Sequence, residues 1–176
     1  MTKEKVVLVD ENDMETGTME KIEAHKKGVL HRAFSVFVVN SRGELLLQRR
    51  AAAKYHSPGL WTNTCCSHPR HGEDVQAAAK RRLYEEMGMD GQLHKSFSFI
   101  YRAEFDNGLT EHEFDHVLIG ISDEEPRPDR DEVDEFIYAD LDELDDDMKD
   151  NPGKYTVWFL IAYPRVKEKL RELVKK

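Results

Sequence analysis

The chain has 176 residues, of which 39% are hydrophobic and 35% charged, and its formal net charge is −9. This length and balance indicate one globular domain over residues 1–176 with a sizeable core. The negative charge argues against nucleic-acid binding, which needs a basic face. No apolar run approaches the ~20 residues of a membrane span, and the N-terminal segment lacks the apolar stretch of a secretory signal. We therefore expect a cytoplasmic protein that does not contact membranes.

Strand and helix patterns alternate in the first half of the chain. Residues 33–40 (AFSVFVVN) are predicted to form a strand, with residues 45–50 (LLLQRR) as its hairpin partner across the turn SRGE. Proline and glycine mark residues 54–73 as a loop. A helix is predicted over residues 74–87, where apolar side chains recur at helical spacing, and Gly88 ends it.

The second half continues with strands and ends in a helix. Residues 96–105 (SFSFIYRAEF) and 109–122 (LTEHEFDHVLIGIS) are predicted strands joined by a DNG turn. Residues 135–141 form a short strand that leads into an acidic helix. Mixed strands, hairpins and separated helices favour an α+β fold with a mixed sheet over a doubly wound parallel one. A terminal amphipathic helix is predicted from the spacing of Val166, Leu170, Leu173 and Val174.

The two cysteines of the chain are adjacent, in the stretch WTNTCCSHP of residues 61–69. A disulfide between sequence neighbours strains the peptide between them and closes almost no loop, so we expect reduced thiols. A metal site and a reactive centre both remain open for Cys65 and Cys66, since His68 follows two residues after the second thiol.

The segment after the cysteines fits the Nudix box, a loop–helix signature that holds a divalent metal against a diphosphate. Ser67 stands where the box has its first glycine, and Arg82 stands where it has a metal-binding glutamate. Arg82 weakens the carboxylate cluster that activates water in the hydrolases, but it adds a bidentate donor for phosphate. Taken alone, this segment is equally typical of an ordinary amphipathic helix with a charged outer face. The positions that match the box are Glu73, Arg81, Leu83, Glu85, Glu86 and Gly88.

Three histidines and two glutamates are candidate ligands of a single divalent transition metal. His25 and His31 do not share a helix face, so they would have to converge from a loop or the entry of a strand. Glu111 and Glu113 lie two apart in a predicted strand and point to the same side. Together with His68 they would form a mixed nitrogen and oxygen site suited to Zn, Mn or Fe. Spacing alone does not separate such a site from unrelated surface residues.

Taken together, the chain resembles the type I isopentenyl-diphosphate delta-isomerases, a Nudix-fold family of isoprenoid biosynthesis, from about Val6 to the C-terminal helix. The resemblance implies a Nudix-like mixed β-sheet sandwiched by α-helices. It also implies an enzyme that interconverts isopentenyl and dimethylallyl diphosphate by protonation and deprotonation. The WTN…C-x-HP loop with the later E-x-E is more specific than the degenerate box. The stretches that carry the likeness are TGTMEKIEAH, LHRAFSVF, LLLQRRAAAKYHSPGLWTNTCCSHP, RRLYEEMG, YRAEF, TEHEFDHV and VWF.

The resemblance assigns roles to individual residues. Cys66 matches the catalytic cysteine, whereas Cys65 matches a position without a catalytic role. Tyr101 and Trp158 match aromatic residues near the isoprenoid tail. The chemistry needs an acid and a base, roles that suit Cys66 and Glu113, and Tyr101 would hydrogen-bond the carboxyl of Glu113 and help pass the proton. Glu86, with the backbone carbonyl of Cys66, matches the ligands of a Mg²⁺ ion at the diphosphate. One Zn²⁺ or Mn²⁺ ion, or Mg²⁺, is implied at the site formed by His25, His31, His68, Glu111 and Glu113.

The expected partner is a small isoprenyl diphosphate, and the chain is expected to be a monomer, with a homodimer left open. One alternative is a Nudix hydrolase of a diphosphate substrate. Two features argue against it: Arg82 replaces a glutamate of the box, and Cys66 and the Glu111–Glu113 pair have no evident role in hydrolysis. Another is a non-enzymatic module that binds metal or diphosphate without turnover. The implied substrate-binding residues are Lys21, Arg50, Lys54, Arg82 and Trp158.

Overall fold

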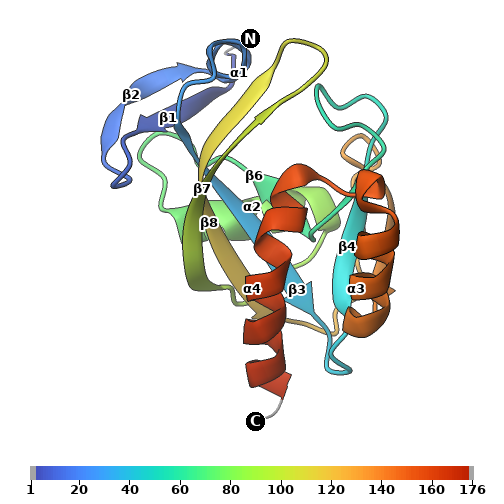
Figure 1. Ribbon diagram of the computed structural model, residues 1–176. Helices are drawn as coiled ribbons and strands as arrows, with labels where there is room; N and C mark the ends of the chain where they lie inside the picture. The colour runs from blue at the N-terminus through green and yellow to red at the C-terminus, as the bar shows by residue number, and fades with distance from the viewer. Residues whose placement is uncertain (1–2, 175–176) are drawn as a thin grey trace.

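The computed structural model describes residues 3–174, in which the strands join one mixed sheet between helical layers (Figure 1). The helices are α1 (Lys21–Lys27), α2 (Val75–Met87), α3 (Leu141–Asp150) and α4 (Val157–Val174), with a 3-10 turn at Pro152–Lys154. In the described part of the chain, none of these helices has the length and apolar character to span a membrane. The strands are β1 (Lys5–Val9), β2 (Glu15–Glu20), β3 (His31–Val39), β4 (Leu45–Arg50), β5 (Trp61–Thr62), β6 (Cys65–Ser67), β7 (His94–Glu104), β8 (Thr110–Ile121) and β9 (Val133–Ala139).

β3 is the central strand, and its partners change along its length. β8 runs parallel to it from His31↔Glu113 to Val39↔Ile121. On the other edge, β1 pairs with the start of β3, β6 with its middle and β4 with its last residue only. The predicted hairpin is therefore wrong beyond its turn, because β4 leaves β3 and pairs with β9 and β5.

The segment between β5 and β6 fills the gap where β3 and β4 diverge. The side-chain amide of Asn63 donates to the carbonyls of Val36 and Cys65, at 3.1 and 2.8 Å. The hydroxyl of Thr64 accepts from the backbone N–H of Val38 at 2.9 Å. Side chains thus satisfy buried backbone groups that a continuous ladder would otherwise pair. The predicted loop contains two short strands, and it carries the cysteines into the sheet.

Helix α2 confirms the predicted helix to within one residue. The carboxylate of Asp74 caps it by accepting from the N–H of Ala77. Gly88 ends it with φ 63°, where a Cβ would come within 2.5 Å of the carbonyl oxygen of Arg127. The apolar face of α2 packs on one side of the sheet, against a cluster that includes Phe34 and Leu118.

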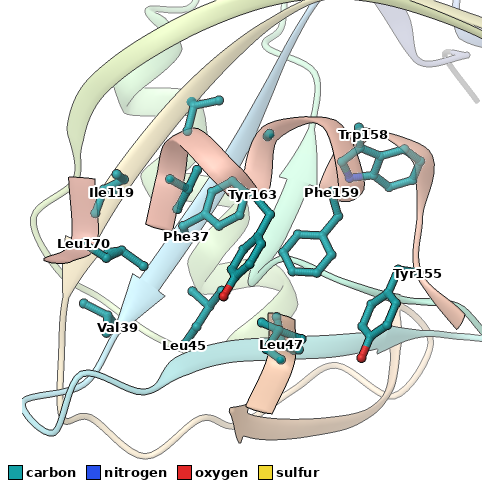
Figure 2. Close-up of a cluster of buried hydrophobic side chains, with 14 of the residues drawn as sticks. Phe37, Val39, Leu45, Leu47, Ile119, Tyr155, Trp158, Phe159, Tyr163 and Leu170 are labelled. Atoms are coloured by element: carbon teal, nitrogen blue, oxygen red, sulfur yellow. The ribbon is translucent and has the colours of Figure 1, made fainter. Parts of the chain in front are cut away.

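Helices α4 and α3 cover the opposite face of the sheet, as Figure 1 shows, and the sandwich predicted from the resemblance is confirmed. Phe159 and Tyr163 of α4 enter a cluster with Phe37 of β3 (Figure 2). The predicted apolar stripe of this helix is only partly right. Leu170 is fully buried but Leu173 is 42% exposed, so the contact ends before the last turn. The side chain of Val174 lies outside the described part of the chain.

The other predicted strands match β7, β8 and β9 within two residues at each end. The N-terminal elements β1, β2 and α1 were not predicted. They matter for function, because α1 lies at the end of the sheet where β7 turns into β8 (Figure 1), and its His25 lies beside His31 at the start of β3.

Candidate active site

Two carboxylates of β8 point to the same side of the sheet, as strand alternation predicts. Glu111 and Glu113 are buried, whereas His112 between them is partly exposed. Tyr101 is paired with Glu113 in the β7–β8 ladder, and its hydroxyl contacts both carboxylates. A phenol carries one proton, so three closely packed oxygen-bearing groups share a single donor. A cation at this point would relieve the repulsion between them.

Three histidines from separate segments gather at Glu113. His31 Nε2 lies 3.1 Å and His68 Nε2 lies 2.7 Å from Glu113 Oε2. His25 comes from α1, and its ring centroid is 5.0 Å from that of His31. One ligand atom from each of these four buried residues lies within 4.8 Å of the others. Such a set of imidazole nitrogens and a carboxylate suits a divalent transition metal.

Backbone carbonyls determine which ring nitrogens face the cluster. His25 Nδ1 is 2.7 Å from the carbonyl oxygen of Lys21, and His31 Nδ1 is 2.9 Å from that of Val29. A carbonyl only accepts, so Nδ1 carries a proton in both rings, and Nε2 is the nitrogen that faces inward, as a metal-ligating histidine needs. Within the described residues, the buried Nε2 of His25 makes no hydrogen bond, and Glu111 Oε1 is 3.5 Å away. The cluster therefore fits a metal ion.

Glu111, the fifth predicted ligand, lies beside this group of four. His56 Nε2 lies 2.7 Å from Glu111 Oε1, and these two form a second possible ligand group with His25. His56 was not predicted, because nothing in its segment distinguishes it from a loop histidine. It is buried, stacked on Phe105 at 5.1 Å between ring centroids and edge-on to Trp158 at 5.7 Å.

The adjacent thiols point to opposite faces of the sheet, because they are successive residues of a strand. Cys66 packs with the cluster under α4 and lines a cavity, where Arg50 NH1 is 3.8 Å from its Sγ. Cys65 is fully buried on the α2 side, and its Sγ donates to Glu86 Oε2 at 2.6 Å. Of the two thiols, Cys66 alone shares a cavity with the glutamates of β8.

This cavity brings together all of the predicted substrate-binding side chains. Arg50 donates to the carbonyl of His56 at 3.2 Å and lies over Trp158, with 5.3 Å between the guanidinium carbon and the ring. The cavity also contains residues that the sequence did not single out, among them Glu4, Tyr55 and Glu132. Its predicted substrate-binding wall consists of Lys21, Arg50, Lys54, Arg82 and Trp158.

Glu86 lies beneath this cavity rather than in its wall. Helix α2 places it against Cys65 and 3.4 Å from Arg82 NH2, with 3% of its surface exposed. Burial raises the pKa of Glu86, and the charge of Arg82 opposes that shift. A carboxylate has about four lone-pair sites, so these two contacts leave acceptor sites for a cation.

The electrostatics give the two candidate acid–base groups different protonation states. Burial raises the pKa of the Cys66 thiol, which is therefore protonated at neutral pH. Burial and the neighbouring Glu111 also raise the pKa of Glu113, but hydrogen bonds from His31 and His68 outweigh them and lower it to about 2. The cavity thus presents one group that holds a proton and one that does not.

The NUDIX domain family model matches residues 29–159. The chain is 53% identical over 162 residues to the isopentenyl-diphosphate delta-isomerase of Pectobacterium atrosepticum, which covers 92% of this chain and 90% of the relative. It is 52% identical over 163 residues to isopentenyl-diphosphate delta-isomerase 2 of Aromatoleum aromaticum, covering 93% and 86%. The isopentenyl-diphosphate delta-isomerase of Halorhodospira halophila is 51% identical over 159 residues, which cover 89% of this chain and 91% of the relative.

Solved structures at lower identity share the fold. A crystal structure from Deinococcus radiodurans matches with a TM-score of 0.70 at 19% identity, covering 84% of this chain and 90% of that one. The MutT protein of Methanosarcina mazei matches with a TM-score of 0.62 at 15% identity, covering 84% and 96%. At such identities the likeness supports the fold and not an activity. The chain has the NUDIX fold and belongs to the isopentenyl-diphosphate delta-isomerase family.

Proposed function

We propose that this chain interconverts isopentenyl diphosphate and dimethylallyl diphosphate by moving a carbon–carbon double bond one position. The observation that carries the proposal is the single cavity lined by Cys66, Glu113 and a group of cationic side chains. Relatives that bear the name of this activity are about half identical to the chain over nine-tenths of its length, at 53% and 92% in one case.

The reaction adds a proton to one carbon and removes another proton two bonds away, so it needs an acid and a base on opposite faces of the substrate. We assign these two roles to Cys66 and Glu113, which line the same cavity, since the thiol is protonated and the carboxylate is not. The reaction is reversible, so each group serves as acid in one direction and as base in the other. Tyr101, whose hydroxyl contacts Glu113, holds the carboxyl in place and can pass it a proton.

Protonating an unactivated alkene produces a tertiary carbocation, which water would trap as an alcohol. Trp158 is 3% exposed, and its ring can lie over the cation, an attraction of about 2 kcal/mol or more where water is excluded. Cys66 and Trp158 line the same cavity. The aromatic wall therefore stabilises the cation without supplying a nucleophile.

We assign one Zn²⁺ or Mn²⁺ ion, or Mg²⁺, to the cluster of His25, His31, His68 and Glu113, with Glu111 as the fifth ligand. A cation bound there supplies positive charge that favours the ionised form of Glu113 and limits its movement. The inward-facing Nε2 atoms and the buried carboxylate support this assignment.

The diphosphate anchors the substrate. We assign its contacts to Lys21, Arg50, Lys54 and Arg82, with one Mg²⁺ ion held by Glu86 and the carbonyl of Cys66. Guanidinium and ammonium groups suit phosphate oxygens. Arg82 occupies the position of a box glutamate, which favours holding a diphosphate over hydrolysing it.

Proton NMR of isopentenyl diphosphate in D₂O, with the purified protein and Mg²⁺, tests the proposal. We expect dimethylallyl diphosphate with deuterium incorporated, and no product with Cys66→Ala. Release of phosphate or a monophosphate would instead support a NUDIX hydrolase. Metal binding without conversion in Mg²⁺, Zn²⁺ or Mn²⁺ would support a binding module.

A further inference from the structure

The cavity that would receive the diphosphate has no net positive charge of its own. Four cationic side chains line it, and so do four carboxylates, so their formal charges cancel when the histidines are neutral. Two of the carboxylates, Glu111 and Glu113, belong to the His/Glu cluster. The other two, Glu4 and Glu132, lie against the cations themselves.

Glu132 bridges two of the cations. Its Oε2 forms an ion pair with Lys54 Nζ, and its Oε1 is 3.6 Å from Arg82 NH2. Each carboxylate oxygen thus faces a different cation, as two oxygens of a bound diphosphate would. Burial raises the pKa of Glu132, but its hydrogen bond to Lys54 and the charges of Lys54 and Arg82 outweigh burial and lower it.

The backbone of Glu132 is held in place on both sides. Its carbonyl accepts from the N–H of Ala51 at 3.1 Å, and its own N–H donates to the carbonyl of Asp129 at 3.0 Å. The backbone N–H of Asp129 in turn donates to the carbonyl of Glu86 at 2.8 Å. The segment is therefore fixed between β4 and α2, and an arriving anion can displace only the side chain. That side chain is 27% exposed and has a path to solvent.

The other two cations differ from this arrangement. Lys21 pairs with Glu4 at 2.8 Å, but the side chain of Glu4 is 55% exposed, so solvent screens this pair more strongly. Arg50 forms no ion pair with a carboxylate in the described part of the chain, and its donors go to the carbonyl of His56 and to Cys66. Glu132 is therefore the carboxylate whose contacts most nearly coincide with those of a bound anion.

We propose that Glu132 is a specificity-determining counter-ion of the diphosphate pocket, which occupies Lys54 and Arg82 in the free protein and gives them up when the diphosphate binds. This inference rests on the proposed function of the cavity. An anion must replace both contacts at once, which favours a diphosphate over a single phosphate. The carboxylate also makes the pocket bind its anion less tightly than the cations alone would.

Isothermal titration calorimetry with inorganic pyrophosphate, in Mg²⁺ and separately in EDTA, tests the proposal on the wild type and on Glu132→Gln. The amide keeps an acceptor for Lys54 and removes the charge. Because a like charge within a few ångströms opposes a bound anion, we expect the Kd for pyrophosphate to fall about tenfold in both conditions. We expect inorganic phosphate to bind the wild type weakly and to gain measurable affinity in the variant.

Glu135→Gln is the matched control. It removes the same charge three residues along the chain, from a carboxylate that pairs with Arg49 at 3.3 Å and does not line the cavity. Its Kd for pyrophosphate should equal that of the wild type. Thermal unfolding checks that each variant is folded, and Glu132→Ser takes the place of the Gln variant if that one is not.

An unchanged or higher Kd in the Glu132 variants would overturn the proposal. Weaker binding confined to Mg²⁺ would also overturn it, by making Glu132 a ligand of the metal instead. If the wild type converts isopentenyl diphosphate while the Glu132 variants bind pyrophosphate no more tightly, the counter-ion proposal fails and the proposed function stands. If the wild type neither converts isopentenyl diphosphate nor binds pyrophosphate, both the counter-ion proposal and the proposed function fail.

Discussion

The thiol of Cys65 donates to the carboxylate of Glu86 across 2.6 Å, and both side chains are buried. The bond joins β6 to α2, so it connects the cysteine-bearing strand to the NUDIX helix. The resemblance gave Cys65 no catalytic role. Its contact with Glu86 also fixes the orientation of a carboxylate assigned to Mg²⁺. The two adjacent thiols therefore serve opposite faces of the sheet, one toward the cavity and one toward the helix.

Replacing each thiol in turn should separate these two roles. Cys66→Ala should abolish turnover while pyrophosphate still binds, since the cations remain. Cys65→Ala should keep most turnover but lower the free energy of unfolding by about 1–3 kcal/mol, through a lost hydrogen bond and a small cavity. NMR turnover assays and urea unfolding measure the two effects. Comparable losses of turnover in both variants would mean that the catalytic thiol has been assigned wrongly.

Glu113→Gln should cost both activity and metal affinity. Glu113 Oε2 contacts His31 and His68 at 3.1 and 2.7 Å, and an amide of the same shape is uncharged and a weak metal ligand. We expect turnover to fall by about two orders of magnitude or more, as for the loss of a general acid–base group. Elemental analysis of the purified variant should show less bound metal. Glu104→Gln, on the exposed end of β7, is the control and should retain both properties. Full activity in the Glu113 variant would exclude an acid–base role for this residue.

Local periodicity predicted much of the sheet and the position of two carboxylates of the site. The period of two in a strand was enough to place Glu111 and Glu113 on one side. It could not show that β4 leaves β3, because that depends on Asn63 and Thr64 satisfying the backbone between the strands. Hydrogen bonds between residues distant in sequence leave no periodic pattern.

The convergence of the histidines could not be derived from spacing either. His25 lies in a short helix that the sequence did not predict, and the pairing of β3 with β8 brings His31 to Glu113 from 82 residues away. The residue types made these side chains candidate ligands, and only the resemblance to a family supported their convergence. It did not include His56, which binds Glu111 from a segment of loop composition.

Metal affinity should rise with pH through the pKa of His31. Burial lowers this pKa, but the hydrogen bond and charge of Glu113 outweigh burial and raise it above the ordinary value. Below that raised pKa the metal-free site holds a proton on His31, which a metal ion has to displace. A pKa raised by folding stabilises the metal-free fold at low pH, and that contribution is lost as pH rises through the folded value. As pH rises through the pKa of His31 in the folded protein, the metal-free fold should lose this stabilisation and the affinity for metal should rise over the same pH range.

Calorimetric titration with Mn²⁺ in buffers of different ionisation enthalpy measures the protons released on binding. We expect release near pH 6–7 that declines toward about pH 8, the range in which histidines titrate. The His31→Gln variant should bind more weakly and release fewer protons. An affinity that does not change with pH across this range would show that His31 is already neutral in the metal-free protein.

His56→Ala should weaken metal binding although His56 is not among the four gathered ligands. Its Nε2 holds Glu111 Oε1 at 2.7 Å, and loss of such an outer partner typically costs about 10–100-fold in metal affinity. His56→Gln keeps a donor and should recover part of the loss. His71→Ala is the control, since His71 is 67% exposed in its side chain and pairs with Glu15 away from the cavity. Competition with a fluorescent chelator gives the affinities, and equal values for His56→Ala and His71→Ala would show that Glu111 binds the metal without help from His56.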